Sequence, residues 1–168
     1  ATMTAAAPER VRPHLRYVIG DATRPDGVGK RLIVHCCNDV GAWGAGFVVA
    51  LSMRFDAPER AYRLLDPPEL YLGMVQYVRV EPTLWVANLV GQHGTGRDAY
   101  GRAPIRYEAI REGLANVREW CRINGASIHM PRMGAGLAGG DWAVIERIIV
   151  EELTMFGFDV TVYDLPQR

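Results

Sequence analysis

The stretch best suited to chemistry in this sequence is residues 31–47, RLIVHCCNDVGAWGAGF, in which an apolar run ends in Asn38. A loop with three glycines and one tryptophan follows: Gly41, Trp43, Gly44 and Gly46. Backbone N–H groups point outward at the start of a helix, where the helix dipole adds partial positive charge, and glycine lets a phosphate approach the backbone closely. The stretch therefore predicts a phosphate or diphosphate site, with an ordinary strand-to-helix turn as the alternative interpretation.

A second glycine-rich loop, residues 131–141 (PRMGAGLAGGD), follows a short apolar run and precedes a segment with helical periodicity. Asp141 is a suitable N-cap for that helix. Two such loops, each leading into a helix, could hold a diphosphate from both sides. A third loop, residues 91–103, is polar, contains four glycines and is long for a connection in a compact domain, which makes it a candidate functional loop.

Strands and helices alternate along the chain that must position these loops. We expect strands at 15–19, 31–37, 73–80, 83–90, 126–130 and 159–163, and helices at 45–55, 58–65, 104–123 and 142–156. This alternation predicts one α/β domain with a largely parallel sheet. Because ligands bind at the carboxyl ends of parallel strands, Asp21 and the three loops are expected on one rim.

The charge balance argues against a general affinity for nucleic acid or membranes, because the 168 residues include 19 basic and 19 acidic side chains. Five arginines lie between residues 97 and 118, but acidic residues accompany them, and we interpret this segment as a solvated helix face. The arginines are Arg97, Arg102, Arg106, Arg111 and Arg118, and the acids are Asp98, Glu108, Glu112 and Glu119.

The remaining bulk features favour a cytoplasmic protein with one domain at 15–168. Residues 1–14 lack the apolar core of a signal peptide and are expected to form a flexible tail, and no apolar run approaches the 18 residues of a membrane span. The three cysteines are interpreted as reduced thiols, with Cys36 and Cys37 on opposite faces of one strand. The scattered histidines and the absence of a CxxC pair predict no metal site.

Taken together, the motifs resemble a macrodomain, the α/β module that binds ADP-ribose. The matching pieces are Gly20-Asp21-Ala22-Thr23, Ile33-Val34-His35-Cys36-Cys37-Asn38 with its loop, Met130-Pro131-Arg132-Met133-Gly134-Ala135-Gly136-Leu137, and Val162-Tyr163-Asp164-Leu165. In detail they look most like the branch with the terminal ADP-ribose protein glycohydrolases and an ADP-ribose-1″-phosphate phosphatase. The resemblance implies a three-layer α/β/α fold with a mixed, mostly parallel six-stranded sheet.

The resemblance also implies which residues bind the ligand. Asp21, with Ala22 beside it, would accept a hydrogen bond from the adenine amino group, and Asn38 would lie near the distal ribose. The two diphosphate loops would be Trp43, Gly44, Ala45, Gly46 and Phe47, and Met133, Gly134, Ala135, Gly136, Leu137 and Ala138, while Asp164 and Leu165 would pack against adenine. The expected partner is ADP-ribose or an ADP-ribosylated protein, bound by a monomer without a cofactor.

The chain departs from the family pattern at the residues that would carry catalysis. Val48 stands where one group of macrodomain hydrolases has an aspartate, Gln92 lies nearest the lysine of the glycohydrolase branch, and Ala138 replaces its paired aspartate. A glutamine cannot act as an amine nucleophile, so a covalent lysine mechanism is not expected. The candidate catalytic residues are therefore His35, Gln92, His93 and Asn38, with the two histidines as possible general bases.

Three functions remain open from the sequence. The first is hydrolysis of mono-ADP-ribose from modified acidic side chains by a mechanism without lysine, in which the loops hold a water beside the anomeric carbon. The second is hydrolysis of ADP-ribose 1″-phosphate, which the HCCN loop and His35 favour. The third is a non-catalytic reader of ADP-ribose, which the missing lysine and aspartate favour.

Overall fold

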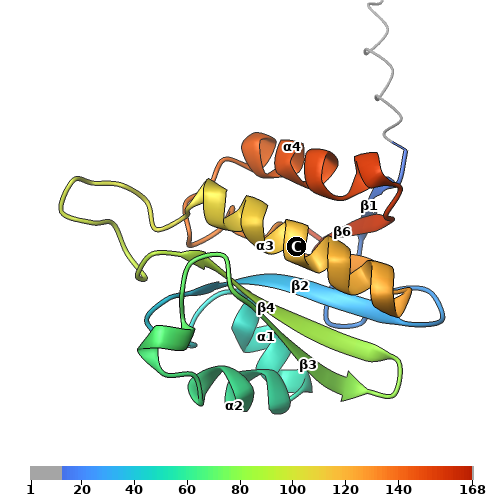
Figure 1. The fold of residues 1–168 in the computed structure, drawn as a ribbon, viewed down its shortest axis with the longest axis horizontal. Helices are drawn as coiled ribbons and strands as arrows, with labels where there is room; N and C mark the ends of the chain where they lie inside the picture. Colours follow the sequence, from blue (N-terminus) through green and yellow to red (C-terminus); the bar gives the residue numbers. More distant parts are fainter. Residues whose placement is uncertain (1–12, 168) are drawn as a thin grey trace, which may run out of the picture.

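The computed structural model describes residues 13–167, in which a six-stranded sheet lies between two pairs of helices (Figure 1). The expected N-terminal tail falls almost wholly outside these residues. The strands are β1 (Leu15–Ile19), β2 (Arg31–Asn38), β3 (Val75–Glu81), β4 (Leu84–Gln92), β5 (Ser127–Met130) and β6 (Val160–Asp164). The helices are α1 (Phe47–Arg54), α2 (Ala57–Arg63), α3 (Tyr107–Asn124) and α4 (Trp142–Glu152), with short 3₁₀ turns at Pro67–Glu69 and Thr154–Phe156.

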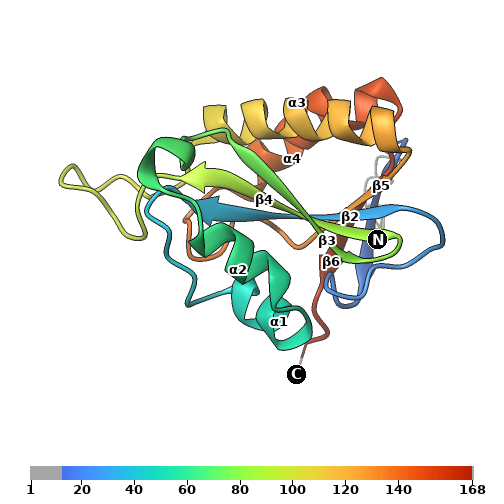
Figure 2. The same ribbon diagram turned by 60° about the horizontal axis from the view of Figure 1, so that its bottom comes forward.

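The sheet has the strand order β1-β6-β5-β2-β4-β3, and only β3, at one edge, runs antiparallel to its neighbour. The helices α3 and α4 cover one face, and α1 and α2 cover the other, as Figures 1 and 2 show from two directions. This arrangement confirms the expected three-layer fold with a mixed, mostly parallel sheet. The carboxyl ends of β1, β2, β4, β5 and β6 therefore lie along one edge.

The central strand β2 is buried on both faces, because its side chains alternate between two apolar cores. Val34 packs with α3 and α4 residues in the larger core, and Ile33 packs with α1 and α2 residues in the smaller one. Cys36 contacts the larger core and Cys37 belongs to the smaller one, which confirms that these two thiols face opposite sides. The strand is thereby fixed in register, and so is the loop that follows it.

The helix expected from Pro104 begins instead at Tyr107. The preceding residues join two loops: Ile105 pairs with Gln92 in an antiparallel bridge, and its N–H donates to the carbonyl oxygen of Ala138 at 3.1 Å. The Ile105 side chain is buried. Residues 103–105 therefore tie the end of β4 to the second glycine-rich loop rather than extending the helix.

Other element boundaries differ from the expectation by a few residues. The helix α1 begins at Phe47, because Gly46 has φ 81° and cannot belong to a right-handed helix. The helix α4 ends at Glu152 and is followed by a 3₁₀ turn. None of the helices between residues 13 and 167 is long and apolar enough to cross a membrane.

Candidate functional site

The two glycine-rich loops enclose a cleft of about 230 Å³ at the carboxyl edge of the sheet. The end of β4 supplies Gln92 to it, and the end of β2 supplies His35. The other lining residues are Cys36, Ala45, Gly46, Phe47, Val48, Pro131, Arg132, Met133, Gly134, Gly136, Leu137 and Ala138. The convergence of both loops that the sequence predicted is therefore present in the structure.

The cleft is bordered by backbone N–H groups without partners. Within residues 13–167, the N–H groups of Ala45 and Gly46 in the first loop and of Gly136 and Leu137 in the second donate to no acceptor. No side chain caps the N-terminus of α1. The loops also meet, since a Cβ atom at Gly46 would lie 3.5 Å from the Cδ1 atom of Leu137. Outward-facing amides at a helix start form an anion-binding surface.

The charged residues around the cleft also favour an anion. None of the lining residues in the described chain is acidic, and Arg132 carries the one formal positive charge among them. The Arg132 guanidinium donates to both oxygens of Asp164, at 2.7 and 3.0 Å, and this ion pair lowers the pKa of the carboxyl group. Arg132 also lies over the rings of Tyr17 and Trp142. These contacts hold the arginine at the side of the cleft.

The structure buries His35 at the floor of the cleft, with 1% of its surface exposed. Its Nε2–H donates to the Oδ1 atom of Asn88 at 2.5 Å, and the Asn88 amide nitrogen donates in turn to Pro58 and Gln76, which fixes the orientation of the amide. Burial lowers the pKa of His35 to about 4, so the ring is neutral near pH 7. This histidine is held by protein partners rather than free to exchange protons with a ligand.

Aromatic packing explains why His35 is so well held. The Trp43 ring meets the His35 ring edge-on, with centroids 5.3 Å apart, and Phe47 packs against it at 5.7 Å. The Trp43 indole N–H donates to the Ser52 hydroxyl, which donates to Glu59. Trp43 is buried and does not line the cleft, nor does the exposed Gly44. These rings support the first loop from below.

Asn38 uses its side chain inside the protein. Its Oδ1 atom accepts hydrogen bonds from the backbone N–H groups of Val40 and Ala42 and from the Tyr62 hydroxyl, and its amide nitrogen donates to the Ala42 carbonyl oxygen. It is 8% exposed and does not line the cleft. The polar residue at the end of β2 thus shapes the loop through an Asx turn.

The residues expected to contact adenine lie at the ends of the neighbouring strands β1 and β6. Asp21 is exposed just after β1, where its Oδ1 atom accepts from the Thr23 N–H and hydroxyl, and Ala22 beside it is buried. Asp164 ends β6 in its ion pair, and Leu165 is 73% exposed. The Gly20 N–H donates to the Asp164 carbonyl oxygen, so the two strand ends are joined.

The strand order determines how the candidate site residues are arranged along the rim. The sheet runs from β1 and β6, past β5 and β2, to β4. Four strand spacings separate β1 from β4, a distance of about 19 Å. The candidate adenine residues therefore lie at one end, the paired loops lie in the middle, and Gln92 lies at the other end. A long ligand could span all three.

His93 occupies the exposed rim beyond Gln92. Its Nδ1 atom lies 2.7 Å from the Oδ2 atom of Asp39, whose other oxygen accepts the Gly94 N–H at 2.8 Å. The carboxylate thereby orients the imidazole with Nδ1–H as donor and leaves Nε2 free to accept a proton. The His93 side chain is 60% exposed and lies outside the cleft lining.

The lysine-dependent mechanism has no residue available here. Lys30, the only lysine in the sequence, precedes β2 and so lies at the opposite edge of the sheet from the cleft. Val48 and Ala138 line the cleft but carry no acid or base. Among residues 13–167, no group of three or more His, Cys, Asp or Glu side chains could hold a metal ion.

Two polar residues of the site were not expected from the sequence. Asp39 directly follows Asn38, but its partner His93 is 54 residues away, so only the pairing of β2 with β4 brings them together. Arg132 belongs to the motif of residues 130–137, but its ion pair with Asp164 depends on the adjacency of β5 and β6. Ala135, in the second loop, does not line the cleft and packs against the larger core.

Comparison with known proteins supports the fold. No family model matches the sequence. A solved protein of unknown function from Bacteroides thetaiotaomicron is 51% identical, with a TM-score of 0.88 over 90% of this chain and 98% of that one. A macrodomain protein from Streptomyces coelicolor is 46% identical, with a TM-score of 0.76 over 89% of this chain and 98% of that one.

A curated relative is larger. The chain is 34% identical over 160 residues to a chromodomain-helicase-DNA-binding protein 1-like from Danio rerio, covering 89% of this chain but 15% of that protein. A more distant structure, Thermosipho africanus DarTG in complex with ADP-ribose, is 19% identical with a TM-score of 0.66, and covers 83% of this chain and 39% of that one. At that identity the likeness shows the fold alone.

The fold and the paired glycine-rich loops thus define an α/β protein with a cleft, bordered by unpartnered amides, at the carboxyl edge of its sheet. The near-complete coverage of the Streptomyces coelicolor protein at 46% identity identifies the class more closely. The chain belongs to the macrodomain family.

Proposed function

We propose that this chain binds ADP-ribose in the cleft between the two glycine-rich loops. One observation carries the proposal: unpartnered amides of both loops border a cleft whose lining has no acidic residue. A diphosphate would accept hydrogen bonds from these amides, as anions do at helix N-termini. The distant relative from Thermosipho africanus, which was solved with ADP-ribose, is consistent with this ligand.

Residues at the strand ends on either side of the two loops would contact the remaining parts of ADP-ribose. Adenine would lie toward Asp21 and Asp164, at the ends of β1 and β6, and the distal ribose would lie toward Gln92 and His93, at the end of β4. The Asp21 carboxylate is exposed and would accept a hydrogen bond from the adenine amino group through the oxygen that Thr23 does not use. The resemblance to macrodomains implies this orientation, and the strand order places the residues along the rim accordingly.

We further propose that the protein removes mono-ADP-ribose from acidic side chains. Water would attack the anomeric carbon of the distal ribose, the bond from that carbon to the ester oxygen would break, and the carboxylate would leave with the bonding electrons. The proton lost by the water would pass to Nε2 of His93, which Asp39 holds in the required tautomer. Gln92 lines the cleft and could orient the water.

A non-catalytic reader of ADP-ribose is the second candidate. It is favoured by the chemistry of the cleft lining itself: the buried His35 is committed to Asn88, and burial raises the pKa of Cys36 to about 12. Neither side chain can supply an active base near pH 7. The same burial of His35 gives the phosphatase alternative little support.

A paired experiment tests these proposals. ADP-ribose is titrated into the protein by calorimetry, and the protein is then incubated with a substrate mono-ADP-ribosylated on glutamate while released ADP-ribose is measured. Binding with release supports the hydrolase, and binding without release supports the reader. Absence of binding would contradict both.

A further inference from the structure

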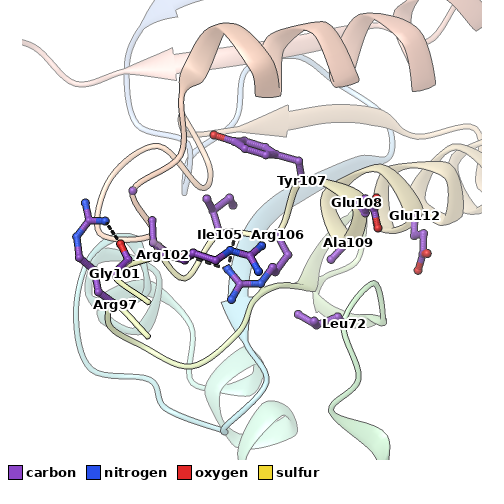
Figure 3. A pocket seen from close by; sticks show the side chains of 12 residues that line it. Leu72, Arg97, Gly101, Arg102, Ile105, Arg106, Tyr107, Glu108, Ala109 and Glu112 are labelled. Atoms are coloured by element: carbon purple, nitrogen blue, oxygen red, sulfur yellow. Dashed lines mark hydrogen bonds between the residues drawn. The ribbon is translucent and has the colours of Figure 1, made fainter. Parts of the chain in front are cut away.

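A second and larger cavity, of about 770 Å³, lies outside the cleft between the loop after β4 and the first turns of α3 (Figure 3). Its volume is in the range of pockets that enclose small ligands. Leu72 and Ile105 contribute apolar walls, and Tyr107 contributes an aromatic one. None of the residues placed in the ADP-ribose cleft lines it.

Two arginines, Arg102 and Arg106, extend toward each other at one end of this cavity, and Arg97 lies further out on the loop (Figure 3). The Arg97 guanidinium donates to the Gly101 carbonyl oxygen at 2.7 Å. Among residues 13–167 the Arg102 side chain itself donates no hydrogen bond, although its backbone N–H donates to the Asp98 carboxylate at 2.9 Å. A guanidinium left without a partner in such a cluster is available to a ligand.

Arg106 is the fixed member of this group. Its Nη1 atom donates to the carbonyl oxygens of Ala103, Pro104 and Ile105 at 2.7 to 3.3 Å, and its Nη2 atom lies 3.6 Å from Asp98. Its side chain is 16% exposed. One cation of this end is therefore preformed, whereas Arg97 and Arg102 are exposed on the loop.

The two ends of the cavity differ in charge. Helix α3 begins here without a side-chain cap, so its dipole adds partial positive charge at the arginine end. Glu108 and Glu112 lie further along the helix, at the other end of the cavity (Figure 3). Carboxylates accept hydrogen bonds, so that end suits the hydroxyl or amino groups of a ligand.

We propose that this cavity binds a small phosphorylated ligand of mononucleotide size. The phosphate would lie between Arg102 and Arg106, whose planar guanidinium groups match phosphate oxygens in pairs. The sugar or base would reach Glu108 and Glu112 along α3. The apolar walls and the Tyr107 ring would cover the middle of the ligand.

The arrangement corrects the interpretation of this segment as a solvated helix face. Arg111 and Arg118 pair across the helices with Glu152 of α4, at 3.0 Å each, whereas Arg97 and Arg102 precede α3 and face the cavity. Asp98 is the acid nearest these arginines: one carboxylate oxygen accepts the Arg102 backbone N–H at 2.9 Å, and the other lies 3.6 Å from the Arg106 guanidinium.

The cavity adjoins the ADP-ribose cleft without sharing its ligand. Residues 103–105 separate the two spaces, since Ile105 lines the cavity on one side while its N–H bonds to Ala138 of the cleft. The inference therefore stands whether or not the cleft binds ADP-ribose, and ligands at the two places would be observed at different amides.

The test is a titration of the ¹⁵N-labelled full chain with uridine 5′-monophosphate, followed through the backbone amide shifts. We expect shifts in residues 97–109 and a smaller response to inorganic phosphate at the same amides. Uridine without a phosphate should leave them unchanged. Titration of ADP-ribose in a separate sample reports on the amides around Gly46 and Gly136, so the two proposals can fail independently.

A matched pair of variants sharpens the test. Arg102→Gln removes the unpartnered guanidinium and should weaken binding of uridine 5′-monophosphate about tenfold or more, as for the loss of a charge-assisted hydrogen bond. Arg60→Gln removes the same charge from an exposed position on α2 and should leave binding unchanged. The amide spectra of both variants show directly whether they are folded.

Several results would overturn the proposal. Equal amide shifts with uridine and with its monophosphate would show that the phosphate does not contribute to binding. Equal losses of affinity in Arg102→Gln and Arg60→Gln would show a general effect of charge rather than a contact with Arg102. Shifts confined to the cleft, or no shifts at all, would contradict the site. Tighter binding of an oligothymidylate without terminal phosphates at the same amides would contradict a small ligand.

Discussion

The floor and the rim of the cleft both present a histidine, but the two side chains are held in opposite ways. At the floor, His35 is 1% exposed and is enclosed by Asn88, Trp43 and Phe47. At the rim, the His93 side chain is 60% exposed and touches Asp39. The histidine inside the motif therefore supports the loop, whereas the histidine outside it presents its ring to solvent.

The same contrast divides the polar groups of the site. The floor uses its hydrogen bonds internally, as in Asn38 and Asn88, while the rim leaves the amides of both glycine-rich loops without partners. Changes at the rim should therefore alter ligand binding or turnover with little effect on folding. Changes at the floor should alter stability.

The largest expected effect is on the rim amides. Gly46→Glu should abolish ADP-ribose binding, because a carboxylate would enter the diphosphate position and repel it. Calorimetry measures the loss. Gly46→Ala keeps the backbone strain of a side chain at φ 81° and ψ −146° without the carboxylate, and Gly157→Glu adds the same charge in open space before β6 at the opposite edge of the sheet. Equal losses in Gly46→Glu and Gly157→Glu would move the diphosphate site elsewhere.

The next effect tests whether the rim histidine carries the reaction. His93→Gln should lower the single-turnover rate of ADP-ribose release by about 100- to 10,000-fold, the usual contribution of a general base. Asp39→Asn should lower it less, because the imidazole remains but loses its orienting carboxylate. Affinity for ADP-ribose should change little in either variant. A wild-type rate in His93→Gln would leave the rim without a catalytic role.

The pH dependence of stability tests whether the buried histidine at the floor of the cleft stays neutral in the folded protein. Burial lowers the pKa of both His35 and His129 to about 4, whereas an unfolded histidine has a pKa of about 6.5. Above pH 6.5 neither state binds the proton. As the pH falls below 6.5, the unfolded chain binds protons that the folded protein refuses, so stability should fall by about 1.4 kcal/mol per pH unit for each histidine.

Urea unfolding at pH 7, 6 and 5 measures this slope, in a window where carboxylates are still ionised. The variant His35→Gln should lose about half of the slope. A stability that stays constant from pH 7 to pH 5 would mean that His35 can be protonated in the folded protein, and the contrast between floor and rim would disappear.

The smallest expected effect concerns the adenine end of the rim. Asp21→Ala should weaken ADP-ribose binding by about 1.5–3 kcal/mol, as for a lost hydrogen bond to a charged group. Asp21→Asn is the closer control, because its side-chain oxygen can still accept from Thr23. Unchanged affinity of Asp21→Ala in calorimetry would place adenine elsewhere.

Much of the architecture could be predicted from the sequence, because strands buried on both faces read as apolar runs and glycine-rich loops mark their ends. The start of α3 could not, since Pro104 and Ile105 are compatible with a helix and only the bridge to Gln92 draws them away from it. The pairs Asp39–His93 and Arg132–Asp164 depend on strand order, which no local pattern contains.

The different environments of His35 and His93 could not be predicted from the sequence either. A histidine in an apolar strand can face either a ligand or a core. Here His35 is held by a hydrogen bond to Asn88, which lies 53 residues further along the chain. The Asn88 amide is itself fixed by Pro58 and Gln76. Residues that meet through tertiary packing alone leave no trace in spacing or periodicity.

The central claim is that the paired loops hold the diphosphate of ADP-ribose. Its most direct measurement is a titration of the ¹⁵N-labelled protein with ADP-ribose, followed at the amides of Ala45, Gly46, Gly136 and Leu137. We expect these amides to shift most, with saturation at one ligand per chain. Shifts that leave both loops unchanged, or no shifts at all, would contradict it.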